Sequence, residues 1–297
     1  MLLTQLEYFV ALARERHFGR AASSVHITQS ALSESIRKLE TELGAALVNR
    51  GRTFEGLTPE GERVLVWARK MVDDHRALID EVHAKPQELS GEARIGVIPS
   101  AIAEAADLVT DLAAGHPLLT VRCDTGLTSE EIIEQIRRFE LDAGLVHPSV
   151  NGGDGVTITP VSEEPLVVVA HENLFPADST TVPARTLATM PVCLLREGMR
   201  GRQVLDSRLA EHGVELHPRV QTDSVEELVA LAHTGSWAAV VPANATRDQP
   251  PGIRALPLTD PAVTLAIAVA TRLEQPQPAL SRAILRAAST RPRTRRG

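Results

Sequence analysis

One face of a single helical segment carries the polar side chains that could do chemistry. Steps of three and four residues place Ser30, Ser33, Glu34, Arg37 and Thr41 on the same side of a helix. Hydroxyl, carboxylate and guanidinium groups on one surface can form hydrogen bonds with a ligand, or they can simply face water. The spacing alone leaves both interpretations open.

Motifs for enzyme chemistry are absent from the sequence. Ser35 and Lys38 have the Ser-x-x-Lys spacing of serine acylases, but Ile36 faces the apolar side and the companion Lys-Thr-Gly element is missing. No zinc, phosphate-binding, dinucleotide-binding or nucleophile-elbow motif occurs, and the ten histidines lack ligand spacing. We therefore expect no enzyme activity, no catalytic residue, no metal site and no cofactor.

Two cysteines, Cys123 and Cys193, each lie in a predicted strand beside Val or Leu. Two thiols cannot make a disulfide framework or a four-thiolate zinc site. We expect both to be buried and inert. A thiol-based redox switch that uses them remains an alternative.

Three short helices within residues 4–43 are predicted to position the polar face. Their apolar stripes are Leu6, Phe9, Val10 and Ala13, then Ala21, Ala22 and Val25, then Leu32, Ile36, Leu39 and Leu43. Thr28 is the expected N-cap of the third helix, and Gly44 ends it. The polar face is then the outer side of that third helix.

A two-stranded wing and a long helix are predicted next. Residues 47–48 and 54–57 can pair across a basic turn that holds Arg50 and Arg52. A helix then begins at Thr58-Pro59-Glu60 and runs to about residue 84.

An apolar seam follows the length of this helix. Its residues are Val64, Ala68, Met71, His75, Leu78 and Val82, flanked by Leu65, Val72 and Ile79. Such spacing is typical of two-helix packing. We expect dimerisation through the seam, with packing against the chain's own domains as the alternative.

Strands and helices alternate beyond a hinge-like stretch at residues 86–91. Strands are predicted at 93–98, 118–123, 141–146, 166–170, 192–195, 218–221, 237–241 and 263–270, and helices at 103–114, 129–139, 201–212, 224–233 and 278–288. The alternation predicts an α/β domain with a mostly parallel sheet covered on both faces. We expect two subdomains, joined by crossovers near 162–165 and 258–268, with a cleft between them.

Composition limits the class of protein. The chain has 297 residues, 43% hydrophobic, 23% charged and 3% aromatic, and its net charge is −7. These values exclude disorder of the whole chain and argue against single-strand nucleic-acid platforms and indiscriminate binding of polyanions. The sequence shows no export signal or apolar run of membrane-spanning length, so a cytoplasmic protein is expected.

A dense set of short motifs occupies residues 18–62. It comprises Ala21-Ala22, Thr28 to Ser33, Ile36, Leu39-Glu40, Leu43-Gly44, Leu47-Val48, Arg50 and Leu57 to Gly61. This set resembles the winged helix-turn-helix of the LysR-type transcriptional regulators, from which Val48 departs where Phe is usual. Weaker signals at 91–97, 141–146 and 241–242 extend the resemblance over nearly the whole chain. It implies an effector-binding domain similar to periplasmic solute-binding proteins.

Domain boundaries follow from these elements. We expect a winged helix-turn-helix DNA-binding domain at 1–58, a linker and dimerisation helix with its hinge at 59–88, and an effector-binding domain at 89–297. Subdomain I would cover about 91–162 and 268–288, and subdomain II about 163–267, followed by a disordered tail at 289–297. The partners expected are double-stranded DNA, a small-molecule effector and a second copy of the chain, in a homodimer or homotetramer.

A helix that enters the major groove reads base edges with its exposed face. The candidates for bases are Gln29, Ser30, Ser33 and Arg37, of which Arg37 suits a guanine and Gln29 an adenine. The candidates for phosphates are Lys38, Arg50, Arg52 and the capping residue Thr58. Glu34 is acidic on a face that must approach phosphates, so it is expected to alter affinity or base preference.

The effector is expected at the carboxyl ends of the strands that border the cleft. The candidates are Ser100, Thr128, Ser129, His147, Met199, Arg200, Arg202 and Ser224. Helix N-termini with hydroxyls and a nearby Arg favour an anion, so a small carboxylate is the expected class. Ordinary helix capping by Thr128 and Ser224 remains an alternative. For the whole chain, the rival of a different class is a solute-binding or enzymatic α/β protein.

Overall fold

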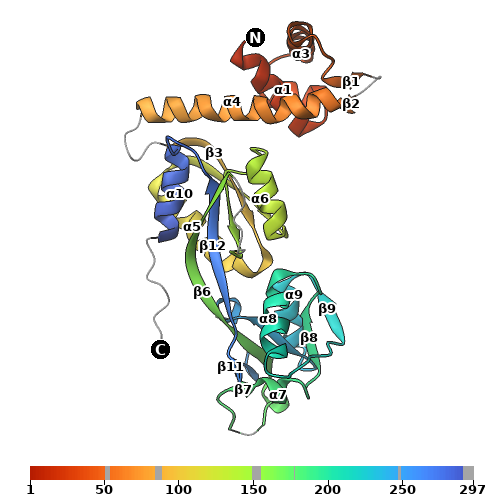
Figure 1. Cartoon of the computed structure of the whole chain (residues 1–297), viewed down its shortest axis with the longest axis vertical. Helices are drawn as coiled ribbons and strands as arrows, with labels where there is room; N and C mark the ends of the chain where they lie inside the picture. The colour runs from red at the N-terminus through yellow and green to blue at the C-terminus, as the bar shows by residue number, and fades with distance from the viewer. Residues whose placement is uncertain (51–53, 84–88, 149–154, 177, 247–248, 290–297) are drawn as a thin grey trace. The chain divides into compact units, whose positions relative to one another are not determined.

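The computed structural model describes residues 1–50, 54–83, 89–148, 155–176, 178–246 and 249–289 (Figure 1). The chain divides into two compact units. The first consists of Met1–Pro86 with Arg138–Glu140, and the second of Gln87–Arg137 with Leu141–Gly297. Within the described residues, no helix is both long enough and apolar enough to cross a membrane.

Three helices and a two-stranded wing share one core in the first unit. They are α1 (Leu3–Glu15), α2 (Phe18–Ser24), α3 (Gln29–Leu43), β1 (Val48–Arg50) and β2 (Phe54–Leu57). The rings of Phe18 and Phe54 meet edge to face with centroids 6.3 Å apart, which fixes the wing against the helices. The predicted helices and wing are confirmed, although Leu43 of the third stripe is 41% exposed.

The long helix α4 (Pro59–His83) packs only its first turns on this core. Leu65 and Ala68 are buried there, against the core that includes α1. Four apolar side chains further along α4 stay exposed, namely Met71, Leu78, Ile79 and Val82. Packing within the described residues of the first unit therefore accounts for the beginning of the apolar seam.

A ten-stranded sheet forms the centre of the second unit. Its main path has the order β4-β3-β5-β12-β6-β10-β8-β9, and β11 pairs with both β6 and β7. The strands are β3 (Ser90–Val97), β4 (Leu118–Thr125), β5 (Ala143–Val146), β6 (Val156–His171), β7 (Val182–Pro183), β8 (Val192–Leu195), β9 (Val220–Thr222), β10 (Ala238–Pro242), β11 (Ile253–Thr259) and β12 (Thr264–Arg272).

The sheet is mixed, which corrects the expectation of a mostly parallel one. β3 pairs in parallel with β4 and β5, and β8 with β9 and β10. β6, in contrast, runs antiparallel to β10, β11 and β12. β6 is also much longer than the strand expected at 166–170. Its first ten residues were not predicted as strand because they include two prolines and several polar residues, which are not typical of a central strand.

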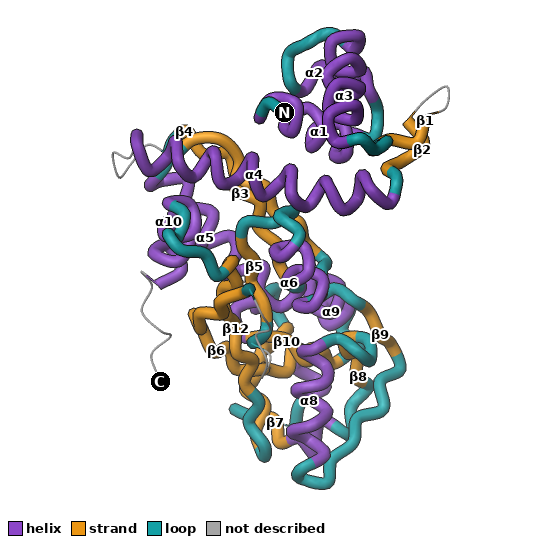
Figure 2. Tube along the Cα trace, turned by 45° about the horizontal axis from the view of Figure 1, so that its top comes forward, coloured by secondary structure: helices purple, strands orange, loops and turns teal. Residues whose placement is uncertain are grey.

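β6 and β12 join the two halves of the second unit (Figure 1). The first half comprises β3 to β5 with α5 (Ile102–Gly115), α6 (Ser129–Arg137) and α10 (Ala279–Ser289); the second half comprises β7 to β11 with α7 (Ala184–Leu187), α8 (Arg200–Ala210) and α9 (Val225–His233). Residues 156–165 of β6 pair with β12, and residues 166–171 pair with β10 and β11. Figure 2 shows α8 and α9 beside β8 and β10.

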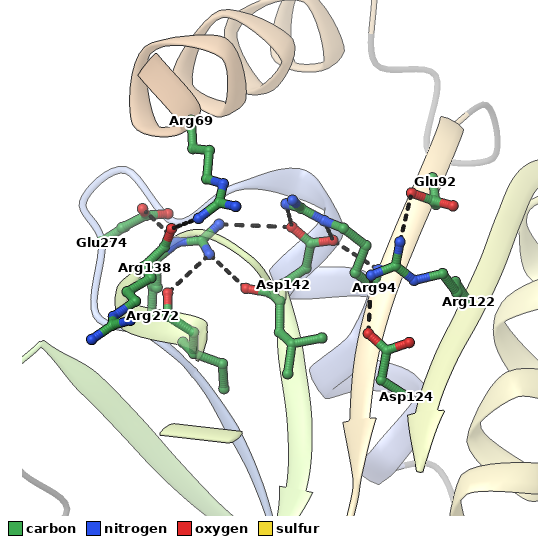
Figure 3. Close-up of polar contacts among 11 residues, drawn as sticks. Arg69, Glu92, Arg94, Arg122, Asp124, Arg138, Asp142, Arg272 and Glu274 are labelled. Atoms are coloured by element: carbon green, nitrogen blue, oxygen red, sulfur yellow. Dashed lines mark hydrogen bonds and ion pairs between the residues drawn. The ribbon is translucent and has the colours of Figure 1, made fainter. Parts of the chain in front are cut away.

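A buried ion-pair cluster holds β5 in the first half (Figure 3). Asp142, which directly precedes β5, accepts hydrogen bonds from Nε and Nη2 of Arg94 at 3.0 and 2.6 Å. Arg272 of β12 lies 3.8 Å from the same carboxylate and donates to the Leu141 carbonyl at 2.8 Å. Because all three charged side chains are largely buried, the cluster ties together three neighbouring strands.

Candidate functional site

The polar face of α3 is exposed along its length. Leu32, Ile36 and Leu39 point into the core and are at most 1% exposed, so the side chains between them face outward. All five predicted DNA-contacting residues of α3 are exposed: Gln29, Ser30, Ser33, Arg37 and Lys38. The structure therefore brings them together on one surface, as the helical spacing requires.

Local sequence fixes both ends of α3. Thr28 Oγ1 accepts a hydrogen bond from the backbone N–H of Ala31 at 3.2 Å and lies 3.0 Å from Ser30 Oγ. Gly44 ends the helix in the left-handed conformation with φ of 68°. The first turn, which carries Gln29 and Ser30, is thus held in one position.

Glu34 lies between the two cations of this face. Its Oε2 is 3.7 Å from Nη1 of Arg37, and its Oε1 is 3.9 Å from Nζ of Lys38. Both cationic side chains are 67% exposed. Ion pairs this long and this exposed contribute little energy, so either cation can exchange Glu34 for another anion.

The wing is anchored by the end of α3. Glu40 Oε1 accepts hydrogen bonds from the N–H groups of Leu47 and Val48 at 2.9 and 3.3 Å. This role of Glu40 was not predicted from the sequence, where an acid near the end of the helix is the only local signal. β1 places the backbone of Arg50 opposite Phe54. The Arg50 side chain and the whole of Arg52 lie outside the described residues.

Thr58 caps the start of α4 and bonds the chain that leads into the wing. Its Oγ1 donates to the Ala46 carbonyl at 2.6 Å and accepts from the N–H of Gly61 at 2.9 Å. A Cβ at Gly61 would clash with the Leu47 carbonyl, so α4 starts in direct contact with the wing. These two hydrogen bonds give Thr58 a structural role, and its contact with a phosphate stays a prediction.

A cleft of about 580 Å³ lies between the halves of the second unit. The first half contributes residues from 98–102, 125–130 and 147, and the second half contributes residues from 195–203 and 223–226. Seven of the eight predicted effector residues line it, namely Ser100, Thr128, Ser129, His147, Met199, Arg200 and Ser224. The position of the cleft at strand ends and helix N-termini agrees with the expected topology.

Arg202 does not line the cleft, which corrects the expectation. Its side chain is 5% exposed, its Nε lies 2.8 Å from both carboxylate oxygens of Asp206, and its Nη1 donates to the Leu195 carbonyl at 3.0 Å. Arg202 therefore fixes the start of α8 against the end of β8.

Hydrogen bonds fix the floor of the cleft. His147 Nδ1 donates to the Ala266 carbonyl at 3.0 Å, so its neutral ring accepts the Ser100 hydroxyl proton at Nε2, 2.9 Å away. The His147 N–H donates to Ser129 Oγ at 3.1 Å. Burial lowers the pKa of His147, with a smaller lowering by Arg200 that is opposed by the Ala266 hydrogen bond and Glu130. The floor is consequently neutral.

Helix N-termini border the same cavity. Thr128 Oγ1 accepts from the Glu131 N–H at 3.2 Å, and Glu131 accepts from the Thr128 N–H at 2.8 Å, a reciprocal cap for α6. Ser224 caps α9, whereas Met199 gives α8 no side-chain cap. Capping and cleft lining thus coexist at Thr128 and Ser224. Sequence reasoning missed Glu130 and Glu226, because acids in a first helical turn have an ordinary structural explanation.

A half-buried carboxyl joins the two halves near β6. Glu104 of α5 accepts hydrogen bonds at Oε1 from Asn244 of η3 (Ala243–Thr246) at 2.6 Å and from Ser162 at 3.5 Å. Its Oε2 is buried without a hydrogen bond. Burial, opposed in part by a backbone hydrogen bond and aided by the nearby Glu164 carboxylate, raises the pKa of Glu104 to about 7.

Neither cysteine lines the cleft. Cys193 is buried as expected, and burial raises the pKa of its thiol to about 11. Cys123 is exposed on β4, which corrects the expectation of burial. Desolvation and then the neighbouring Asp124 carboxylate raise its pKa as well, so both thiols are poor sources of thiolate.

Two family models match the chain. Residues 3–62 match the bacterial regulatory helix-turn-helix protein model of the lysR family, and residues 86–292 match the LysR substrate binding domain. The DNA-binding transcriptional dual regulator OxyR of Escherichia coli is 28% identical over 244 residues, covering 82% of this chain and 79% of the relative. A probable hydrogen peroxide-inducible genes activator of Mycobacterium avium is 32% identical over 194 residues, 65% of this chain and 62% of that protein.

Solved structures agree over nearly the whole chain. A full-length OxyR variant from Pseudomonas aeruginosa superposes with a TM-score of 0.77 at 25% identity, covering 97% of this chain and 94% of that one. Full-length CbnR in complex with its target DNA has a TM-score of 0.68 at 22% identity, with coverage of 97% and 99%, and shows the shared fold. Together with the family models, these similarities establish that the chain belongs to the LysR family of DNA-binding transcriptional regulators.

Proposed function

We propose that this LysR-family regulator reads double-stranded DNA with α3 and responds to a small molecule in the cleft. A helix with fixed ends and an exposed polar face can enter the major groove as a rigid element. Gln29, Ser30, Ser33 and Arg37 are proposed to contact base edges, and Lys38, Arg50 and Arg52 to contact phosphates. DNA as the partner supports a cytoplasmic location.

A second copy of the chain is the proposed partner of α4. The exposed side chains of Met71, Leu78, Ile79 and Val82 support a helix pair that buries them between two protomers. Two linked DNA-binding units would bind paired half-sites with greater avidity than one. A homodimer, or a homotetramer built from such dimers, follows from this proposal.

The effector proposal rests on one observation, the cleft whose lining comes from both halves. A ligand that contacts both halves favours one closure of the cleft over another, because it binds the two states with different affinity. A carboxylate would suit Arg200 and the uncapped start of α8. In this proposal, residues 1–58 bind DNA, residues 59–88 form the dimer, and residues 89–297 bind the effector.

A redox-responsive regulator is the second candidate, favoured by the similarity to peroxide-inducible activators. The raised pKa values of Cys123 and Cys193 argue against it, because oxidation by peroxide proceeds through the thiolate. A Cys193→Ser variant should therefore bind the promoter as the parent does, with and without hydrogen peroxide. Oxidant-dependent binding that the substitution removes would favour the redox candidate.

The DNA proposal is tested with Arg37→Ala. We expect binding to the upstream region of the protein's own gene to weaken about tenfold, mainly at one base pair, because an Arg-to-guanine contact carries about 1–3 kcal/mol of discrimination. Fluorescence anisotropy against that duplex, its single-base variants and a random duplex measures this. An unchanged affinity and sequence profile would refute the assignment.

The effector proposal is tested with Ser100→Ala combined with Thr128→Ala. We expect a reduced response of promoter binding to effector-containing cell extract, with unchanged DNA binding in its absence. The matched control is Thr110→Ala, because Thr110 lies on the exposed side of α5 outside the cleft. A full response in the double variant would show that the cleft is placed wrongly.

A further inference from the structure

Charges around the cleft point to a narrower class of effector than carboxylates in general. The charged side chains of the lining are Arg196, Arg200, Glu130, Asp223 and Glu226. Two are basic and three are acidic, so their formal sum is −1. His147 adds no charge near neutral pH, because burial lowers its pKa. An effector with only negative groups would therefore meet fixed charges that repel it slightly.

These charges differ in whether they have partners. Arg196 Nη2 lies 2.5 Å from Asp223 Oδ2, and Glu226 Oε2 accepts the Ser224 hydroxyl proton at 2.8 Å. In the part of the chain that the structure describes, the side chains of Arg200 and Glu130 have neither a hydrogen bond nor an ion pair. Counting the described residues alone, the cleft thus holds one exposed cation and one exposed anion that have neither a hydrogen bond nor an ion pair.

Arg200 and Glu130 come from different halves of the second unit. Arg200 begins α8 in the second half, and Glu130 lies in the first turn of α6 in the first half. Each is close enough to His147 to shift its pKa, in opposite directions. A single small ligand can form ion pairs with both side chains only if it carries a negative group for one and a positive group for the other.

We propose that the effector is a zwitterion of the α-amino-acid type, with its carboxylate on Arg200 and its ammonium on Glu130. This inference rests on the proposed effector function of the cleft. The carboxylate also faces the start of α8, whose N–H groups have no side-chain cap. Ser100 offers an acceptor to the ammonium, since its proton is directed to His147 and its oxygen lone pairs remain.

Apolar residues around the charged pair suit an aliphatic side chain. Ile98, Ile102, Leu127 and Leu195 line the same cavity, whose volume of about 580 Å³ exceeds that of any single amino acid of this kind. Closure of the two halves around the ligand would reduce the excess space. The zwitterion would draw the halves together because its opposite charges attach to opposite walls.

Thermal-shift titration of the full-length protein tests the ligand class. The probes are the twenty standard amino acids and, for leucine, two analogues that each lack one charge, 4-methylpentanoate and 3-methylbutylamine. We expect at least one aliphatic amino acid to raise Tm. Its matched carboxylate and amine should bind at least tenfold more weakly.

Two charge-removing variants test which side chain binds the carboxylate of the ligand and which binds its ammonium group. Arg200→Gln should weaken the amino acid and the matched carboxylate alike, by at least tenfold, whereas Glu130→Gln should abolish the preference for the amino acid over the carboxylate. Arg208→Gln on α8 and Glu134→Gln on α6 are the matched controls, because both side chains lie outside the cleft on the same helices. Promoter binding without ligand shows that each variant is folded.

Two outcomes overturn the inference: equal binding of carboxylate and amino acid, or no binding by any of the twenty amino acids. Different results would contradict the proposed effector function of the cleft. If 4-methylpentanoate alone binds and changes promoter binding, effector control stands and the zwitterion does not. If promoter binding by the Ser100→Ala, Thr128→Ala double variant still responds to cell extract, the cleft is excluded as the effector site.

Discussion

The polar face of α3 and the floor of the cleft hold their functional side chains in opposite ways. Arg37 and Lys38 are each 67% exposed and loosely paired. Ser100, Ser129 and His147 are 5–6% exposed and linked by hydrogen bonds. An exposed, loosely paired cation loses side-chain freedom when it binds a ligand, whereas the cleft floor is ordered beforehand. Substitutions on α3 should therefore change binding alone, and substitutions in the interior of the second unit should also change stability.

The largest effect is expected from Asp142→Ala, which tests the ordered interior of the second unit. The substitution leaves Arg94 and Arg272 buried without their carboxylate, so the free energy of unfolding should fall by about 3 kcal/mol or more. Urea unfolding followed by Trp237 fluorescence in a Trp67→Phe background reports the second unit.

Asp124→Ala is the matched control for Asp142→Ala. Asp124 pairs with Arg122 at 2.9 Å, but the two side chains are 37% and 41% exposed, so the loss should stay below about 1 kcal/mol. Equal losses in the two variants would mean that the buried cluster gives the second unit no special rigidity.

Glu104→Gln should produce a pH-dependent effect of intermediate size. The folded pKa of Glu104 is raised from 4.5 to about 7, so its stabilising contribution is complete below pH 4.5 and is lost as pH rises through 7. Above pH 7 the variant should be more stable than the parent, by about 2 kcal/mol at most because the carboxyl is partly exposed.

Unfolding measured from pH 5 to pH 8.5 checks the sign for Glu104. The groups around this carboxyl are Glu164, Ser162 and Asn244, and the last two remain hydrogen-bond donors throughout this range. Glu163→Gln on β6 is the control, because it removes an exposed carboxyl from the strand that carries Ser162 and Glu164. A parent and a Glu104→Gln variant with parallel pH profiles would contradict the expectation.

The smallest effect is expected from Glu34→Gln, on the exposed polar face of α3. Removing a carboxylate from the face that is proposed to contact DNA should tighten DNA binding about threefold and leave the free energy of unfolding within about 0.5 kcal/mol. Anisotropy and urea unfolding measure the two quantities. Glu7→Gln on α1 is a charge-matched control away from this face. Weaker binding by Glu34→Gln would instead indicate that the carboxylate accepts a hydrogen bond from a cytosine amino group.

Local signals allowed α3 to be predicted well from the sequence. Thr28, Gly44 and the stripe of Leu32, Ile36 and Leu39 all act within a few residues, so the exposed face follows from periodicity alone. β6 and β11 were not predicted in full, because their pairing partners are distant in the sequence and their polar residues resemble those of loops.

Two arginines show why the cleft was only partly predictable. Arg200 and Arg202 lie two residues apart on α8, yet one borders the cavity and the other is buried against Asp206. Successive residues of a helix are about 100° apart around its axis, so Arg200 and Arg202 point about 200° apart and only one of them can face the cavity. Which arginine meets the ligand depends on the rotation of α8 about its axis, and hence on tertiary packing.

The continuity of β6 limits how such a molecule can be taken apart or recombined. The first half of the second unit is not a single uninterrupted stretch of chain, since β6 carries the polypeptide out to the second half and β12 brings it back. A cut at either crossover would remove backbone hydrogen-bond partners from a strand that both halves share. The unpaired strand edge could then pair with another chain. Recombination can therefore exchange the first unit separately, whereas the second unit has to be kept intact.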